Sequence, residues 1–289
     1  MKLNILILPI LLSCDFSEKS IVIFDPKGQH GDDFVRTGLD VLLEDYPGYL
    51  QGKTIGLVTN QTGVSRHGDK NYQLFQNNPD IDLRTIFAPE HGFYGEASAG
   101  TKVAYTDNSI SGPKIISLYG KTKKPTDEML NGIDLIIYDI QDIGARFYTY
   151  ISTLGLIMEA AGENKIEVMV LDRPNPIGGT IIEGATLDTT LKSFIGYYPI
   201  PIRYGLTVGE LAYMINGEKW IENQPKLQVI KMENWKRDFW YNETSFPWVK
   251  PSPNIPDLQT AIIYPGMCLL EGTNISEGRG TEKPFKRFG

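Results

Sequence analysis

Short apolar runs alternate with segments of helical periodicity along most of the chain. The runs are continuous rather than alternating with polar residues, which is typical of strands buried on both faces of a parallel sheet. They predict strands over residues 54–59, 83–88, 135–138 and 168–171, and a fifth strand over 114–118. Because strands separated by helical segments favour βα units, we expect an α/β fold with a doubly wound, mostly parallel sheet and helices on both faces.

Two helices can be placed from the same pattern. Ile151, Leu154, Met158 and Ala161 recur at helical spacing and predict a helix over residues 148–161. Thr207 with Glu210 three residues later forms a capping-box sequence, which predicts a helix over 208–220. The aromatic and proline-rich stretch that follows, 235–256, favours a wrapped loop.

The first twenty residues differ in character from the rest. Lys2 precedes a largely apolar run over residues 3–12, which ends at Ser13 and Cys14. This run is shorter than the roughly 20 residues that span a bilayer, but it suits the apolar region of an export signal. The sequence 11–14 (LLSC) resembles the lipobox of bacterial lipoproteins. We therefore expect residues 1–20 to be a lipoprotein signal peptide and tether, with lipid on Cys14 and an exported protein anchored in the cell envelope. The alternative is a buried first strand or helix.

Composition and charge narrow the classes of function. The chain has 289 residues, of which 41% are hydrophobic and 22% are charged, as in an ordinary folded protein. Its net charge is -7, and the sequence contains no cluster of lysines or arginines. The protein would therefore repel nucleic acid and an anionic membrane surface. We expect no nucleic-acid partner, and contact with the membrane through the lipid only. Cys268, the other cysteine, lies in an apolar stretch and is expected to be a buried hydrophobe.

Polar residues gather directly after the predicted strands. Asn60 and Gln61 follow the first strand, Glu90 and His91 follow the second, and Asp139, Asp142 and Arg146 follow the strand at 135–138; Arg173 and Asn175 follow the strand at 168–171. Ligands of open α/β sheets bind beyond the carboxyl ends of the strands. These residues therefore predict a pocket that can form hydrogen bonds with many hydroxyl groups.

The same loops carry motifs that resemble a known family, the NamZ-type exo-β-N-acetylmuramidases. The motifs are GLVTNQTG (56–63), FAPEHGFYGEASAG (87–100), YDIQDIGARFYTY (138–150), LDRPNPIGG (171–179), PSPNIP (251–256) and EGTNISEGRGT (271–281). The resemblance implies a Rossmann-like catalytic domain, here residues 21–256, and a smaller C-terminal domain, of which 257–289 would be only the beginning. It also implies removal of N-acetylmuramic acid from the non-reducing end of peptidoglycan fragments, in a cleft between the two domains.

Glycosidic cleavage usually needs a carboxylic acid that protonates the leaving oxygen, and a second group that attacks or stabilises the sugar cation. Glu90 is our candidate for the acid, since partial burial after a strand favours the protonated form. His91 would form an orienting hydrogen bond with Glu90 or with the substrate. A surface glutamate held at a helix N-terminus is the alternative interpretation. The candidates for the second group are Asp139, Asp142, Glu183 and Glu277, and the acetamido oxygen of the substrate could serve instead.

N-Acetylmuramic acid carries a lactyl carboxylate, which a planar arginine fork can bind. Arg146 and Arg173 are the candidates, although either could pair with Asp142 or Asp172 instead. Tyr148 could stack on a sugar ring or pack in the core. The full set predicted to bind substrate is Asn60, Gln61, Asp142, Arg146, Tyr148, Arg173, Asn175, Asn274 and Arg279. The last two lie in segment 271–280, which we expect to be a loop that folds over the cleft. No cofactor is expected, and the three histidines lack the spacing of a metal site.

Two alternatives to a glycosidase stay open. The first is a non-catalytic lipoprotein that binds peptidoglycan fragments, left by truncation of the cleft. The second is an esterase or amidase, although the chain has no Gly-x-Ser-x-Gly sequence around a nucleophile.

Overall fold

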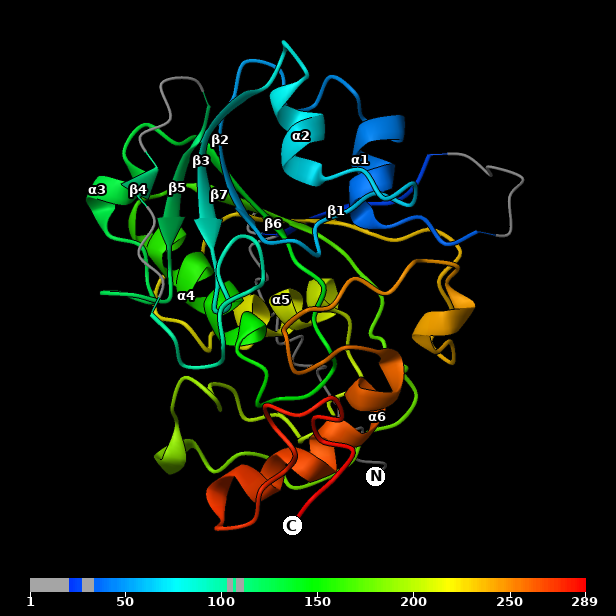
Figure 1. Cartoon of the computed structure of the whole chain (residues 1–289). Coiled ribbons are helices and arrows are strands. Elements are labelled where there is room, and N and C mark those ends of the chain that lie inside the picture. Colours follow the sequence, from blue (N-terminus) through cyan, green and yellow to red (C-terminus); the bar gives the residue numbers. More distant parts are fainter. Residues whose placement is uncertain (1–20, 28–33, 103–105, 108–111) are drawn as a thin grey trace, which may run out of the picture.

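A mostly parallel eight-stranded sheet forms the centre of the protein (Figure 1). The computed structural model describes residues 21–27, 34–102, 106–107 and 112–289. The strand order is β1-β8-β7-β6-β2-β3-β5-β4, and every neighbouring pair is parallel except β4 with β5. The strands are β1 (Ile21–Phe24), β2 (Thr54–Thr59), β3 (Asp82–Ala88), β4 (Thr106–Asp107), β5 (Lys114–Ser117), β6 (Leu135–Asp139), β7 (Glu167–Leu171) and β8 (Leu227–Ile230). The predicted α/β class and the five predicted strands are confirmed.

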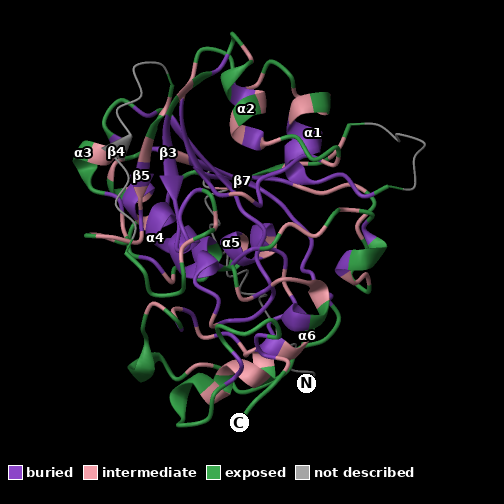
Figure 2. Cartoon of the chain, viewed as in Figure 1, coloured by how far each residue is buried: buried purple, intermediate pink, exposed green. Residues whose placement is uncertain are grey.

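Helices cover both faces of this sheet. On one face lie α1 (Gly38–Asp45) and α2 (Asn71–Gln76), and on the other lie α4 (Tyr150–Glu163) and α5 (Val208–Gly217). A short helix, α3 (Asp127–Leu130), precedes β6. Figure 2 shows the central strands and the inner sides of α4 and α5 as buried. Burial on both faces explains why the strands are continuously apolar in sequence.

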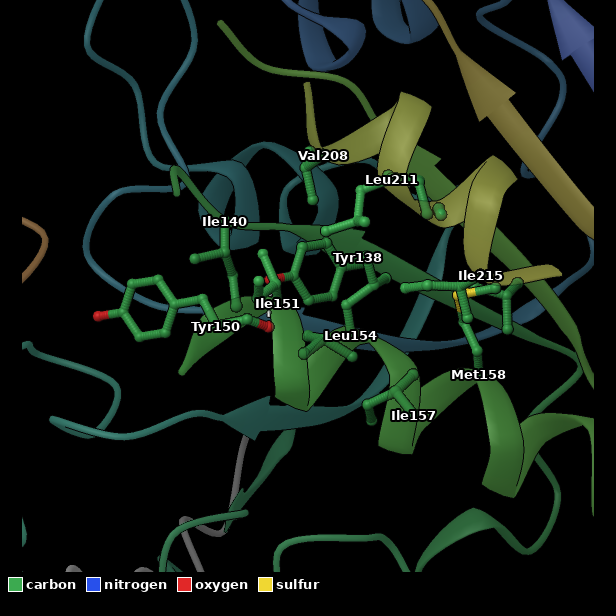
Figure 3. Close-up of a cluster of buried hydrophobic side chains, with 14 of the residues drawn as sticks. Tyr138, Ile140, Tyr150, Ile151, Leu154, Ile157, Met158, Val208, Leu211 and Ile215 are labelled. Carbon is green, nitrogen blue, oxygen red and sulfur yellow. Dashed lines mark hydrogen bonds between the residues drawn. The ribbon is translucent and has the colours of Figure 1, made fainter. Parts of the chain in front are cut away.

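Side chains of successive residues in each strand point to opposite faces of the sheet, so they pack against different layers of helices. Leu57 and Ile137 point to the cluster that includes Leu39 of α1, whereas Val58 and Tyr138 point to the cluster of α4 and α5. Figure 3 shows Tyr138 of β6 enclosed by side chains of α4 and α5. Its hydroxyl donates to the Tyr150 carbonyl oxygen at 3.0 Å, so even this buried polar atom is paired.

The chain winds in two directions from the middle of the sheet. From β2 it proceeds to β3 and β5 on one side, and from β6 it proceeds to β7 and β8 on the other. The loops that leave the carboxyl ends of β2 and β6 therefore diverge. Such a reversal opens a crevice at the sheet edge, which is where α/β proteins bind their ligands.

Three helices begin with a side-chain cap. Thr37 and Thr207 form capping boxes with Asp40 and Glu210, and Asp257 accepts a hydrogen bond from Thr260 at the start of α6 (Leu258–Met267). The predicted capping box is thus confirmed, and the helix it opens ends three residues earlier than expected. Helix α4 begins and ends two residues later than the predicted 148–161, and its N-cap residue, Thr149, makes no cap bond.

The last part of the chain packs on the same core. Ala261 and Tyr264 of α6 and Phe285 belong to the apolar cluster of α4 and α5. Stretch 235–256 contains only a short 3₁₀ helix (Tyr241–Glu243), so the predicted wrapped loop is confirmed. Two further 3₁₀ helices occur, at Thr189–Leu191 and Cys268–Gly272. The second takes in the first two residues of segment 271–280, which was predicted to be a loop throughout; its remainder has no regular structure.

Among the described residues, no helix combines the length and apolar character needed to cross a membrane. The predicted signal peptide, tether and lipid site at Cys14 lie outside the described residues. Cys268 is partly buried against the core, and burial raises the pKa of its thiol to about 12. It is therefore a neutral packing residue, less enclosed than expected.

We expect Leu154→Ala to lower the free energy of unfolding by about 2–5 kcal/mol, because Leu154 is fully buried between the sheet and α5 (Figure 3) and its loss leaves a cavity. Urea unfolding measures the change. Leu191→Ala, at a side chain that is 70% exposed, is the matched control and should change stability by less than about 0.5 kcal/mol. Equal losses in the two variants would contradict the packing described above.

Candidate functional site

The polar loops that the sequence singled out leave the sheet at the carboxyl ends of β2 and β6, where the winding of the chain reverses. Asn60 and Gln61 leave β2, and the loop from Asp139 to Thr149 leaves β6. The loop after β3 joins them, since Gly95 packs directly against the Gln61 side chain. Gln61 also donates to the carbonyl oxygens of Lys250 and Pro251 at 2.8 and 3.1 Å. Four segments distant in sequence therefore meet at one edge of the sheet.

Glu90 lies in this group as a buried carboxyl, 7% exposed. Its Oε1 accepts the backbone N–H of Gly100 at 3.0 Å, and its Oε2 accepts the Thr149 hydroxyl at 2.6 Å. Tyr119 is close by: burial, followed by the nearby Glu90 carboxylate, raises the pKa of Tyr119 to about 12. The side chain that the sequence nominated as the acid is thus fixed at both oxygens.

His91 has the backbone conformation of a tight turn. Its φ of 70° lies in the left-handed region, which non-glycine residues rarely adopt and which occurs often at functional sites. The ring Nδ1 is 2.8 Å from the Ala97 carbonyl oxygen, and burial lowers the pKa of the imidazole. His91 is therefore a neutral side chain that holds the loop after β3 in place, and its ring faces Tyr148 with 6.5 Å between the ring centres.

Asp139 and Arg173 are paired with each other. The Arg173 Nε is 2.6 Å from Asp139 Oδ1 and its Nη2 is 3.0 Å from Oδ2, and both side chains are almost fully buried. Asn71 donates a further bond to Asp139 at 2.7 Å, and Arg173 donates one to the Val64 carbonyl oxygen at 3.0 Å. This bidentate arrangement holds the ends of β6 and β7 together. Both charged groups have their hydrogen bonds within the protein rather than with a ligand.

Asp142 is a buried carboxyl with one oxygen open. Its Oδ2 accepts the Gly144 N–H at 2.7 Å and the Tyr204 hydroxyl, whereas its Oδ1 is buried without a partner. Burial raises the pKa of Asp142 to about 6, and hydrogen bonds from the Tyr204 hydroxyl and from the backbone N–H groups of Gly144 and Ile143 oppose part of that rise. A carboxyl of this kind can exchange a proton near neutral pH.

Arg146 has no acidic partner among the described residues. Its Nη1 donates to the carbonyl oxygens of Ala185 and Ile200 at 2.7 and 2.6 Å, and its buried Nε is unpaired. The anticipated partners, Asp142 and Asp172, are therefore wrong for both arginines: the Arg173 guanidinium pairs with Asp139 instead, and Arg146 pairs with no described carboxylate. A buried guanidinium without a counter-ion is a ready receptor for an anion.

Four of the residues predicted to bind substrate share one property. Each has a buried polar atom without a hydrogen-bond partner: Asn60 Nδ2, Gln61 Oε1, Asp142 Oδ1 and Arg146 Nε. Buried polar atoms in folded proteins are nearly always paired, and a ligand or water is a common partner for those that are not. Asn175 differs, because it bonds to Leu206 and Ile177 and serves a turn.

The remaining candidates lie farther along the chain. Glu277 is buried and accepts from Arg279 at 2.8 Å, which lowers the pKa of its carboxyl. Arg279 also pairs with Glu271 at 2.6 Å, and its charge reaches His91. Asn274 is exposed. Glu183 is also exposed and pairs with Arg203 at 3.1 Å, rather than with a residue of the Glu90 group.

The sequence did not single out Thr149, Tyr119 or Tyr204 as site residues. Thr149 lies within the motif 138–150, which was the only available signal, and nothing local marks a tyrosine 62 residues away as the partner of Asp142. A separate cavity of about 300 Å³ is lined by Phe34, Val35, Arg66, His67, Thr244, Ser245 and Phe246, and includes none of the predicted residues.

Comparisons with known proteins bear on this group of residues. The family model described as exo-β-N-acetylmuramidase NamZ, N-terminal, matches residues 55–259, and the C-terminal model of the same family matches 262–289. The peptidoglycan β-N-acetylmuramidase NamZ of Bacillus subtilis (strain 168) is 51% identical over 255 residues, which are 88% of this chain and 61% of that protein. The chain thus spans less than two thirds of that relative.

Two solved structures of DUF1343 family proteins from Bacteroides fragilis NCTC 9343 have the same fold. One superposes with a TM-score of 0.82 at 44% identity and covers 89% of this chain and 65% of that one. The other has a TM-score of 0.76 at 36% identity and covers 88% and 67%.

We expect Arg173→Met to lower the free energy of unfolding by about 3–5 kcal/mol, because it leaves the Asp139 carboxylate buried and without its counter-ion. Arg84→Met is the matched control, since the Arg84–Asp82 pair is about half exposed and such pairs contribute about 0–1 kcal/mol. Urea unfolding of both variants decides the matter, and an Arg173→Met protein as stable as the control would show that the pair does not hold the strand ends.

We expect Asp142→Asn to alter how stability depends on pH. The pKa of Asp142 is raised from 3.8 to about 6 in the folded protein, so its carboxyl favours folding below about pH 4, and this contribution is lost as the pH rises through 6. The wild type should therefore lose stability relative to the variant between pH 4 and 7, by on the order of 1–3 kcal/mol. Urea unfolding at several pH values measures the difference, and parallel profiles would contradict it.

Proposed function

Because the chain belongs to the NamZ family of exo-β-N-acetylmuramidases, we propose that it is a glycoside hydrolase that releases N-acetylmuramic acid from the non-reducing end of peptidoglycan fragments. The observation that carries the proposal is the Glu90 carboxyl, which is buried and held at both oxygens by loops that meet at the carboxyl edge of the sheet. The fold supplies rigidity, and the loops supply the chemistry.

Glu90 is the general acid in this proposal. Its proton passes to the glycosidic oxygen as the bond to the sugar breaks, and a carboxylate remains. Among the candidates for the second group, Asp142 is favoured because its buried Oδ1 has no hydrogen-bond partner, whereas both oxygens of Asp139 bind Arg173. Glu183 and Glu277 are paired with arginines. The acetamido oxygen of the substrate itself is the other source of this function.

Arg146 is the proposed receptor for the lactyl carboxylate that distinguishes N-acetylmuramic acid from other amino sugars. It is buried and unpaired at Nε, whereas Arg173 already binds Asp139. Asn60 and Gln61 have unpaired atoms suited to the hydroxyl and acetamido groups of a sugar, and Tyr148 is proposed to contact the sugar beside them. Arg279 and Asn274 would close over the substrate from segment 271–280.

We also propose that the protein is exported and anchored by lipid on Cys14 in the cell envelope, facing the periplasm or the outer membrane. The lysine, apolar run and LLSC sequence of residues 1–20 support this location. A substrate derived from the cell wall would be encountered there.

The test is hydrolysis of a disaccharide with N-acetylmuramic acid at its non-reducing end, followed by detection of the free sugar. We expect Glu90→Gln to lower the rate by about 10²–10⁴-fold, the usual contribution of general acid catalysis. Glu96→Gln, an exposed glutamate on the same loop, is the matched control and should retain wild-type activity. Binding of the disaccharide without turnover by the wild type would favour a non-catalytic binding protein, and hydrolysis of acyl substrates instead would favour an esterase or amidase.

A further inference from the structure

Thr149 has an unusual role for a threonine at the start of a helix. Thr37 and Thr207 also precede helices, and both have extended backbones (ψ 167°). The hydroxyl oxygen of each accepts a hydrogen bond from the backbone N–H of the third residue of its helix. This is the common use of a threonine at that position. Thr149 instead has ψ of -8° and makes no cap bond, although it precedes the 14-residue helix α4.

The Thr149 hydroxyl is directed to Glu90 instead. It donates to Glu90 Oε2 at 2.6 Å, and both side chains are 7% exposed. The bond joins residues 59 positions apart, from the loop after β3 to the start of α4. Helix α4 therefore begins without a side-chain cap, and the Thr149 hydroxyl, which could have formed that cap, donates its hydrogen bond to Glu90 instead.

The groups that bond to Glu90 are not equivalent, and they include the Tyr119 hydroxyl beside the Gly100 N–H and the Thr149 hydroxyl. The Gly100 N–H on Oε1 can only donate, whereas a hydroxyl group can donate or accept. Oε1 therefore keeps an acceptor role in every protonation state, and the proton of the acid form belongs on Oε2, next to Thr149. A hydroxyl at that position can adapt to the acid form and then donate to the carboxylate.

We propose that Thr149 is the positioning residue of Glu90: it fixes the carboxyl group and stabilises the anion that forms when the proton leaves. In that step the Glu90 O–H bond breaks, an O–H bond forms on the glycosidic oxygen, and the C–O bond breaks with its electron pair on that oxygen. The donated bond from Thr149 strengthens as the carboxylate gains its charge. This inference rests on the role of Glu90 in the proposed function.

Other titratable groups also face Glu90. Tyr119, Tyr148 and Tyr150 lie within electrostatic reach of its carboxylate, as does His91, which in turn feels the charge of Arg279. None of them is changed by a substitution at Thr149. A comparison of variants at that position therefore isolates the one hydroxyl group.

The experiment measures kcat, KM and the pH–rate profile of the full chain on the same disaccharide. We expect Thr149→Val to lower kcat by about 10- to 100-fold with little change in KM, which is the value of one hydrogen bond to a charged group. The basic limb of the profile should move to higher pH, because a carboxylate without this donor forms less readily. Thr149→Ser, which keeps the hydroxyl, should restore both.

Thr37→Val is the matched control, because it removes a hydroxyl that does cap a helix. It should lower the Tm and leave the pH profile unchanged. Thr149→Ala serves if Thr149→Val does not fold. Carbon-13 NMR titration of the Glu90 carboxyl, identified by its absence in Glu90→Gln, gives a readout that needs no turnover: the midpoint should rise in Thr149→Val and not in Thr149→Ser.

The outcomes separate this inference from the proposed function. If Glu90→Gln is as active as the wild type, the acid is misassigned and the role of Thr149 falls with it. If Glu90→Gln is inactive but Thr149→Val keeps the wild-type rate, pH limb and carboxyl titration, the proposed function stands and the inference about Thr149 is wrong.

Discussion

The buried ion pair between Asp139 and Arg173 is the interaction on which the site depends. It joins the ends of β6 and β7, and through Asn71 and Val64 it also fixes α2 and the loop that leaves β2. These segments lie at the edge of the sheet where its winding reverses. Since a charge without its partner is costly to bury, the pair sets a single arrangement of the strand ends and of the loops that follow them.

The residues around this pair show the opposite property. Asp139 and Arg173 have their hydrogen bonds satisfied by the protein, whereas Asp142 and Arg146, a few residues farther along, each keep a buried polar atom unpaired. Unpaired buried groups reduce stability, and the extensive apolar layers on both faces of the sheet offset this cost. A binding site for a polar ligand requires a rigid framework whose own polar groups are paired, together with nearby polar atoms that are left unpaired for the ligand.

The starts of the helices show the same division between stability and chemistry. Helices α1, α5 and α6 have side-chain caps at their N-termini, so local sequence is sufficient to fix where they begin. Helix α4 relies instead on packing against the sheet and against α5, which leaves the Thr149 hydroxyl available to Glu90. Departures from local rules are expected at functional sites, where tertiary contacts compensate for them.

Local pattern determined much of the fold. Continuous apolar runs identified five of the six inner strands, and the Thr207–Glu210 spacing identified α5, because burial and capping are encoded within a few residues. The edge strand β1, its inner neighbour β8 and the short helix α2 were not predicted, since brief elements take their stability from their neighbours. The sequence also indicated that polar loops would gather at one sheet edge. Only the tertiary structure decided which arginine is paired, which aspartate has an open oxygen and which hydroxyl holds Glu90. Hydrogen bonds between residues tens of positions apart depend on side-chain directions in space, which no periodicity along the chain records.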